Sequence, residues 1–176
     1  GFASGSMGHE IDFALIAEDI IGFLDAAPDR QLVIMGHFDE TLLPEPLRGR
    51  VESHKFSSYE AYLETLSTVD CAVMPLTDDA FNRCKSGVRV IDAAAVAVPS
   101  LVGTVSDMAQ MVSDQNTGFV IPKGESWRAA LDTLAQDRAL VTQMGQAARQ
   151  SLLKNWTART TLPVVEQAVI DWVQKG

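Results

Sequence analysis

Residues 72–99 read AVMPLTDDAFNRCKSGVRVIDAAAVAVP, and this stretch decides the fold. Its first five residues form an apolar run typical of a buried strand, and the polar residues after them indicate a loop. From Val88 onward, the spacing of Val, Ile and Ala predicts a helix that packs under a sheet and ends before Pro99. A strand, a polar loop and a helix N-terminus together present free backbone N–H groups to an anion. The stretch therefore predicts an α/β domain with an anion-binding site.

The loop and the first helical turn supply charges for such a site. Arg83 and Lys85 are cations, and Ser86 is a residue type that caps helix N-termini. Lys85, Arg89 and Asp92 are spaced at i, i+4 and i+7, so we expect them to share one helix face. A buried helix with one polar stripe at its anion-binding end leads us to the hypothesis that this stretch forms a nucleotide-binding site. The residues by themselves support an anion-binding α/β domain and no narrower function.

Strands alternate with helices along the whole chain. This order predicts a Rossmann-like doubly wound, mainly parallel sheet with helices on both faces. The chain opens as though a strand had been cut close to its end, and the last helix is expected to turn Val164, Val165, Ala168, Val169 and Trp172 inward. The other expected strands are 31–37, 51–56, 72–76, 100–103 and 119–122, and the expected helices are 12–26, 59–66, 88–98, 105–112, 125–135, 138–153 and 160–174.

Composition narrows the class of protein. A formal net charge of −9 argues against nucleic acid or an anionic membrane as the main partner, but not against a phosphate ligand held by local cations. We find no apolar run long enough for a transmembrane segment and no signal peptide, so a cytoplasmic location is expected. Cys71 and Cys84 are too few for a disulfide framework or a metal site. A reactive Cys84 is disfavoured because no base neighbours it in sequence.

The N-terminal stretch S-G-S-M-G, residues 4–8, lies just before a predicted helix. Gly5 and Ser6 allow the backbone to approach a ligand closely, and the helix behind them points its N-terminus at it. His9 and Asp12 lie three apart on the first turn. Two interpretations stay open here: a ligand-binding turn, or a helix start in which Asp12 is an ordinary first-turn acid and Ser6 a cap.

Two motifs resemble the donor-binding domain of nucleotide-sugar glycosyltransferases of the GT-B fold, in particular the retaining group-1/GT4-like enzymes. Residues 81–99 read F-N-R-C-K-S-x-x-R-x-x-D-A-A-A-x-x-V-P, beside a family pattern of roughly F-N-R-A-K-S-x-x-K-x-x-E-x-A-A-x-G-V-P. Residues 4–13 match the family's S-G-[ST]-x-x-H-x-x-D-F. The runs V-P-S-L-V-G and M-V-x-D-x-x-T-G-F-V-I also resemble the family, so the likeness covers nearly all 176 residues.

The resemblance implies roles for individual residues. Arg83 and Lys85 would hold the donor diphosphate and act in catalysis, and Asp92 would hold the ribose hydroxyls. The family usually has Glu where Asp92 stands, which shortens the reach by one methylene, and Gly where Ala97 stands, a packing position. Phe56 and Ser57 are expected to lie beside the nucleotide base and to contact it mostly through their backbone. The remaining expected donor-binding residues are Gly5, Ser6, His9, Asp12, Gly36, Asn82 and Ser86.

Transfer of a sugar from such a donor requires that the leaving diphosphate be stabilised as its charge develops. Arg, Lys and helix N-termini can do this without a metal. No Asp-x-Asp motif is present, and the adjacent Asp78 and Asp79 are read as a solvated turn. We assign no protein nucleophile.

In this family two Rossmann-like domains face a cleft, and the acceptor half is N-terminal. Residues 1–176 are therefore expected to be a single nucleotide-sugar-binding domain, with C-terminal helices from about 125 to 176 and the N-terminal acceptor domain absent. Such a fragment would bind a nucleotide-sugar and lack turnover alone.

Two alternatives remain. One is a non-catalytic transferase-like domain that serves as an interaction or nucleotide-sensing module, for which Asp92 in place of Glu is the best support. The other is an unrelated Rossmann-like nucleotide binder. The sequence has no G-x-G-x-x-G after a predicted strand and no G-x-x-x-x-G-K-[ST], which disfavours NAD chemistry and P-loop hydrolysis.

Overall fold

The structure, a computed structural model, describes residues 1–5, 9–55, 58–157 and 171–174. Within these ranges six strands form two three-stranded sheets, and every pairing of strands is parallel. The first sheet has the order β1-β2-β3 and the second the order β4-β5-β6. The strands are β1 (Phe2–Gly5), β2 (Leu32–Gly36), β3 (Val51–His54), β4 (Ala72–Met74), β5 (Ser100–Gly103) and β6 (Gly118–Ile121).

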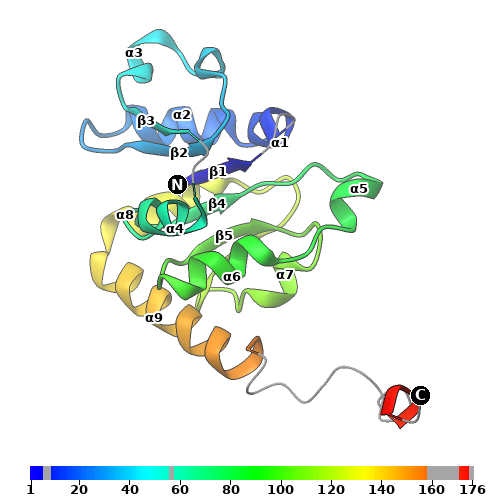
Figure 1. Ribbon diagram of the computed structural model, residues 1–176. Helices are drawn as coiled ribbons and strands as arrows, with labels where there is room; N and C mark the ends of the chain where they lie inside the picture. The colour runs from blue at the N-terminus through cyan, green and yellow to red at the C-terminus, as the bar shows by residue number, and fades with distance from the viewer. Residues whose placement is uncertain (6–8, 56–57, 158–170, 175–176) are drawn as a thin grey trace.

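The two sheets meet at β1 and β4. The Val73 N–H donates a hydrogen bond to the Gly1 carbonyl oxygen at 2.8 Å, and the Gly1 ammonium donates to the Cys71 carbonyl oxygen at 2.7 Å. The strands therefore lie in the spatial order β3-β2-β1-β4-β5-β6, of which Figure 1 labels the first five. This is a doubly wound order whose direction reverses between β1 and β4, so the Rossmann-like expectation is confirmed.

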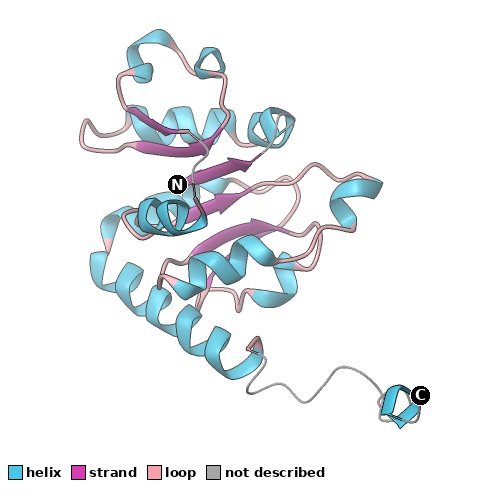
Figure 2. Ribbon diagram, viewed as in Figure 1, coloured by secondary structure: helices cyan, strands magenta, loops and turns pink. Residues whose placement is uncertain are grey.

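Helices cover both faces of the sheet (Figure 2). Because successive side chains of a strand point to opposite faces, Ile34 packs with the helices α2 and α8, whereas its neighbour Met35 packs with α4 and α6. Helix α9 packs across α6 through Ala148 and Leu152. The described helices are α1 (His9–Ala14), α2 (Ala17–Asp25), η1 (Glu40–Leu42, 3₁₀), α3 (Glu45–Arg48), α4 (Tyr59–Leu66), α5 (Ala80–Arg83), α6 (Val88–Ala95), α7 (Met108–Met111), α8 (Trp127–Gln136) and α9 (Arg138–Asn155).

Several helix boundaries follow from caps that are legible in the sequence. The Ser58 hydroxyl accepts from the Ala61 N–H at 3.3 Å and starts α4 where a helix is expected. The Asp137 carboxylate accepts from the N–H groups of Ala139 and Leu140 and starts α9. Helices α8 and α9 match the two helices expected from residue 125 to residue 153.

Other boundaries differ from expectation. The helix expected at 12–26 is two helices, because hydrogen bonds from Leu15 to Asp12 and from Ile16 to Phe13 close α1 with a tighter turn. Short helices also interrupt the expected loops at 39–50 and 77–87. Helix α7 spans only part of 105–112.

The start of α6 also corrects the sequence interpretation. Its N-cap residue is Gly87, with no side-chain cap, so Ser86 does not cap the helix. Lys85 consequently lies before the helix, and only Arg89 and Asp92 of the expected polar stripe are on it.

Helix α6 ends in a backbone motif that explains the family's glycine at position 97. Ala97 has φ 59°, and the N–H groups of Val98 and Ala97 donate to the carbonyls of Ala93 and Ala94 at 2.9 and 3.1 Å. This pair of bonds is a Schellman motif, whose left-handed residue is usually glycine. Position 97 is thus set by backbone conformation, whereas the sequence suggested packing. Gly145 of α9 lies against it, so close that a Cβ there would sit 1.9 Å from the Ala97 carbonyl oxygen.

The last expected helix lies mostly outside the described residues, and Val164, Val165, Ala168 and Val169 are among those not described. Residues 171–174 are helical, but Trp172 is 76% exposed, so the expectation that it turns inward is wrong. No helix in the described part of the chain is long and apolar enough to cross a membrane.

Candidate functional site

Several of the predicted site residues, among them Asp12, Asn82 and Lys85, lie where the winding of the sheet reverses. We call this place the switch point: the carboxyl ends of β1 and β4, helix α1, and residues 77–92 after β4. Ligands of doubly wound sheets bind outside the carboxyl ends of the strands at such a point. The strand ends reach it because β1 and β4 are neighbours in the sheet although their sequences are far apart.

Asp12 is the centre of the switch point. Its side chain comes from α1 and is buried, with the residue 3% exposed. Oδ1 accepts hydrogen bonds from the Thr77 N–H at 2.7 Å, the Thr77 hydroxyl at 2.8 Å and the Asn82 side-chain amide at 3.3 Å. Oδ2 lies 2.9 Å from Nδ1 of His9. One carboxylate thus ties α1 to the loop after β4.

These partners keep Asp12 ionised. Burial alone would raise the pKa of its carboxyl group, because the charged form loses hydration. The hydrogen bonds from His9 and Thr77 and the nearby Lys85 ammonium outweigh burial and lower the pKa of Asp12 to about 2. Asp12 therefore carries its charge throughout the physiological pH range and acts as a fixed anchor. Asp12 is thus an acid of the first turn of α1, as one of the two interpretations had it, and its side chain also contacts the loop after β4.

Two cations lie beside this anchor. The Lys85 ammonium is 4.0 Å from Asp12 Oδ2 and 5.1 Å from the centre of the Phe81 ring. Arg89 of α6 donates from Nη1 to the Ala3 carbonyl oxygen at 3.4 Å. Burial lowers the pKa of both side chains, and the Asp12 charge opposes this effect. Lys85 sits at the limit of ion-pair distance, so its three donors are available to an incoming anion.

Arg83 is placed differently. Its side chain is 64% exposed, and Nε donates to Asp78 Oδ1 at 2.7 Å. An exposed ion pair of this kind contributes little to stability and is easily exchanged for another partner. Arg83 therefore belongs to the switch point through its place in the loop, but its side chain contacts Asp78 and not Asp12.

Asn82 joins the loop to the anchor. Its side-chain NH₂ donates to the Thr77 carbonyl at 2.9 Å and to Asp79 Oδ2 at 3.0 Å, as well as to Asp12. Asp79 in turn caps α5 by accepting from the Asn82 N–H at 2.8 Å. Among the described residues, Asn82 Oδ1 is a buried side-chain oxygen without a hydrogen-bond partner. The solvated turn expected at Asp78 and Asp79 is exposed, and Asp79 is also a cap.

Asp92 lies on α6 and is 6% exposed. Its Oδ1 accepts a hydrogen bond from the Tyr59 hydroxyl at 2.7 Å, which joins α6 to the first residue of α4. The Asp92 carboxylate raises the pKa of the Tyr59 phenol, and burial followed by Asp92 raises that of Tyr62. The buried Asp92 carboxylate thus lies between α4 and α6, where the Tyr59 hydroxyl covers it.

The remaining predicted residues fall into three groups. Gly5 and Gly36 pair at the carboxyl ends of β1 and β2, where Gly36 has φ 119°. The Ser4 hydroxyl donates to the His37 carbonyl and so ties β1 to the residue that follows β2. The His37 side chain is exposed. Ser86 is exposed. Ser6, Phe56 and Ser57 lie outside the described residues.

Sequence reasoning missed Thr77 and Tyr59. Thr77 directly follows the buried strand β4, and a hydroxyl residue at a strand's carboxyl end could have marked it as a site neighbour. Tyr59 directly follows the cap Ser58 and is the first residue of α4. Its contact with Asp92 is made across two helices and has no local signal.

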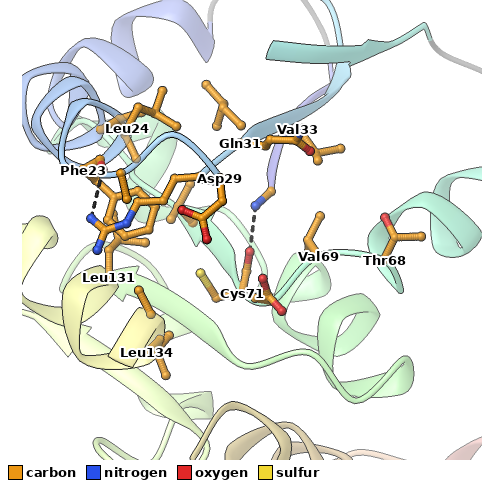
Figure 3. A pocket seen from close by; sticks show the side chains of 18 of the residues that line it. Phe23, Leu24, Asp29, Gln31, Val33, Thr68, Val69, Cys71, Leu131 and Leu134 are labelled. Atoms are coloured by element: carbon orange, nitrogen blue, oxygen red, sulfur yellow. Dashed lines mark hydrogen bonds between the residues drawn. The ribbon is translucent and has the colours of Figure 1, made fainter. Parts of the chain in front are cut away.

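A cavity of about 710 Å³ opens at the opposite end of the sheet (Figure 3). It lies among the starts of β1, β2 and β4 and the helices α2 and α8, with Leu24, Leu131 and Leu134 on one side and Thr68 and Val69 on the other. None of the predicted site residues lines it. The cavity is therefore separate from the switch point.

Cys71 is buried and Cys84 exposed, and both are free thiols. Within residues 1–5, 9–55, 58–157 and 171–174, no group of three or more His, Cys, Asp or Glu side chains is arranged to hold a metal ion.

Comparison with known proteins identifies the family. Residues 13–151 match the model of the family "Glycosyl transferases group 1". The chain belongs to this family. The matched residues include Asp92 and the whole loop from Thr77 to Gly87, so the family assignment covers much of the switch point.

A curated relative of this group 1 glycosyltransferase chain is D-inositol 3-phosphate glycosyltransferase of Kineococcus radiotolerans. The two are 33% identical over an alignment of 115 positions, which covers 58% of this chain and 25% of that protein. The chain thus spans about a quarter of the length of the relative it matches.

Solved structures support the fold. The C-terminal domain of the group 1 glycosyltransferase LpcC from Francisella tularensis superposes with a TM-score of 0.70 at 16% identity, over 89% of this chain and 85% of that one. WaaG, a glycosyltransferase of lipopolysaccharide biosynthesis, gives a TM-score of 0.73 at 18% identity, over 99% of this chain and 46% of that one. Anabaena HepE in complex with UDP gives a TM-score of 0.68 at 13% identity, over 99% of this chain and 48% of that one. The expected fold, a C-terminal GT-B domain, is confirmed.

Proposed function

We propose that this group 1 chain is the nucleotide-sugar donor-binding domain of a retaining, GT4-like glycosyltransferase. The observation that carries the proposal is the position of Lys85, 4.0 Å from the ionised Asp12 at the switch point. An ammonium fixed beside a buried carboxylate, at the carboxyl ends of parallel strands, suits a diphosphate that bridges the loop and the sheet. HepE, whose fold matches 99% of this chain, has been solved with UDP and with UDP-glucose, which supports this class of ligand.

We propose for the individual residues the roles that the family resemblance implies. Lys85 holds the donor diphosphate together with Arg83, which exchanges Asp78 for a phosphate oxygen. Asp12, held by His9 and Thr77, positions Lys85. Asp92 accepts the ribose hydroxyls. Gly5, Ser6, Gly36, Phe56, Ser57, Asn82 and Ser86 complete the proposed donor-binding set.

In the reaction, the bond between the anomeric carbon and the diphosphate oxygen breaks, and the departing diphosphate takes the electron pair. Lys85 and Arg83 stabilise this charge in place of a metal ion. The anomeric carbon forms a bond to the oxygen of an acceptor hydroxyl, and the proton of that hydroxyl passes to the departing diphosphate. Neither the acceptor nor a nucleophile is assigned.

We further propose that residues 1–176 are one domain of a longer cytoplasmic transferase, whose N-terminal domain binds the acceptor. The chain covers less than half of WaaG and HepE, which supports this organisation. On this proposal the 176-residue chain binds a donor and turns over little by itself.

The test is calorimetric titration of the chain with UDP, GDP, ADP and dTDP. Binding of one diphosphate, with its nucleoside alone much weaker, is the expected result. If none of the four binds, the donor-binding proposal is wrong for this domain.

A second candidate, a non-catalytic interaction or nucleotide-sensing module, is favoured by one observation. Asp92 is shorter than the family's Glu, and its Oδ1 is occupied by Tyr59. On that candidate, nucleotide binding would be independent of Asp92, and Asp92→Asn would leave the affinity for the preferred diphosphate unchanged.

A further inference from the structure

The proposed function leaves one contact at the switch point unexplained. Tyr59 donates its hydroxyl hydrogen to Oδ1 of Asp92 at 2.7 Å, and the proposal gives this carboxylate to the ribose. The two residues differ sharply in exposure: Asp92 is 6% exposed, whereas Tyr59 is 58% exposed. A buried acceptor is thus covered by a side chain that itself lies largely in water.

The surroundings of Asp92 restrict how a ligand could reach it. Tyr62 lies on the same helix as Tyr59, with ring centres 6.1 Å apart, and Asp92 also acts on its phenol. Both tyrosines come from α4, which packs against α6. Tyr62 is held by this packing, but the ring of Tyr59 is exposed and can turn away at the cost of one hydrogen bond.

The length of Asp92 makes this arrangement possible. A carboxylate one methylene shorter than Glu stays close to the α6 backbone and leaves room above it for a phenol. The covering tyrosine and the short acid therefore belong together.

We infer that Tyr59 competes with the donor's ribose for Asp92 and thereby determines which ligands gain from that carboxylate. The inference rests on the proposed function. A ligand that offers one hydroxyl exchanges one hydrogen bond for another and gains nothing from Asp92. A ribose offers two adjacent hydroxyls and gains one bond. The ligand class selected is therefore the ribonucleoside diphosphate.

The test compares wild type, Tyr59→Phe, Asp92→Asn and the double variant. Each is titrated with UDP, GDP and ADP and with the 2′-deoxy form of each. Tyr59→Phe keeps the ring and removes only the hydroxyl. We expect it to bind the preferred ribonucleotide about tenfold more tightly, the size of one hydrogen bond to a charged group. In the Asp92→Asn background the same change should have no effect.

The deoxynucleotides supply a readout that a purely structural tyrosine would not move. In the presence of Tyr59, Asp92→Asn should weaken binding of the ribonucleotide and leave the affinity for its 2′-deoxy form unchanged. In the Tyr59→Phe background it should weaken both. Glu60→Gln, an exposed change one residue away, is the control and should match wild type.

The outcomes separate this inference from the proposed function. Equal or weaker ribonucleotide binding by Tyr59→Phe, beside normal binding by wild type, overturns the competition alone. Absence of binding in every variant overturns both the proposed function and the inference.

Discussion

The Asp12 carboxylate accepts both the N–H and the hydroxyl of Thr77, at 2.7 and 2.8 Å, across 65 positions of sequence. This contact joins the two halves of the sheet on the side where ligands bind in doubly wound folds. It fixes the start of the loop that carries Arg83 and Lys85. The geometry of the proposed diphosphate site therefore depends on a residue that need not touch the ligand.

Replacing this anchor should destabilise the domain. In Asp12→Ala the half-buried N–H and hydroxyl of Thr77 lose their acceptor, and we expect the free energy of unfolding to fall by about 2–4 kcal/mol. Urea denaturation measures the change. Asp107→Ala is the control, since Asp107 is exposed and makes no cap hydrogen bond at α7. A loss of the same size in both variants would contradict the role of Asp12.

The ionisation of Asp12 should appear in the pH dependence of stability. Its pKa is about 2 in the folded chain, below the ordinary value of 3.8, so unfolded chains bind more protons at acidic pH. The stabilisation is complete above pH 3.8 and is lost as pH falls toward 2. We expect about 2 kcal/mol of the stability difference between wild type and Asp12→Asn to disappear over that range. A difference that stays constant from pH 6 to pH 2 would show that the Asp12 charge is not stabilised by folding.

The end of α6 offers a stabilising change. Ala97 holds φ 59°, a conformation that costs an alanine about 1 kcal/mol and a glycine almost nothing. Ala97→Gly should therefore raise the free energy of unfolding by about 0.5–1 kcal/mol. The matched change Ala95→Gly, two residues earlier in the helix, should lower it by about 1 kcal/mol. Thermal or urea unfolding of the two variants measures these changes. A lower free energy of unfolding in both variants would mean that position 97 is not under conformational strain.

Arg83 should separate binding from stability. Because its side chain is exposed and paired only with Asp78, Arg83→Ala should leave the unfolding transition where it is. If Arg83 turns to the diphosphate, the same variant should weaken nucleotide affinity about tenfold. Arg138→Ala, another exposed arginine in an ion pair, serves as the control for general charge effects. Unchanged nucleotide affinity in Arg83→Ala would show that Arg83 does not bind the diphosphate, and Lys85 would remain as the proposed cation.

The sequence predicted the alternation of strands and helices because each element carries its own periodicity or cap. The apolar run before Thr77, the cap at Ser58 and the helix pair from 125 to 153 are local signals of this kind. The motifs also named Asp12, Asn82 and Lys85, which lie close together in the structure.

What escaped prediction depends on contacts between distant residues or on backbone conformation. The bond from Tyr59 to Asp92 spans 33 positions and two helices, and no periodicity announces it. The division of the first helix, the cap at Gly87 and the left-handed Ala97 are set by how neighbouring segments pack. The sequence gives Ser86 the chemistry of a cap, but the chain turns one residue later.

The central claim is that Lys85 binds the donor diphosphate. The most direct measurement is the affinity of wild type, Lys85→Ala and Lys154→Ala for whichever of UDP, GDP, ADP and dTDP the wild type binds most tightly. Lys154 is an exposed lysine in the last turn of α9 and controls for loss of a positive charge. Removing a charge-assisted hydrogen bond should weaken binding by about 1.5–3 kcal/mol, or roughly 10- to 150-fold, in Lys85→Ala alone. Equal dissociation constants for the three proteins would contradict the claim.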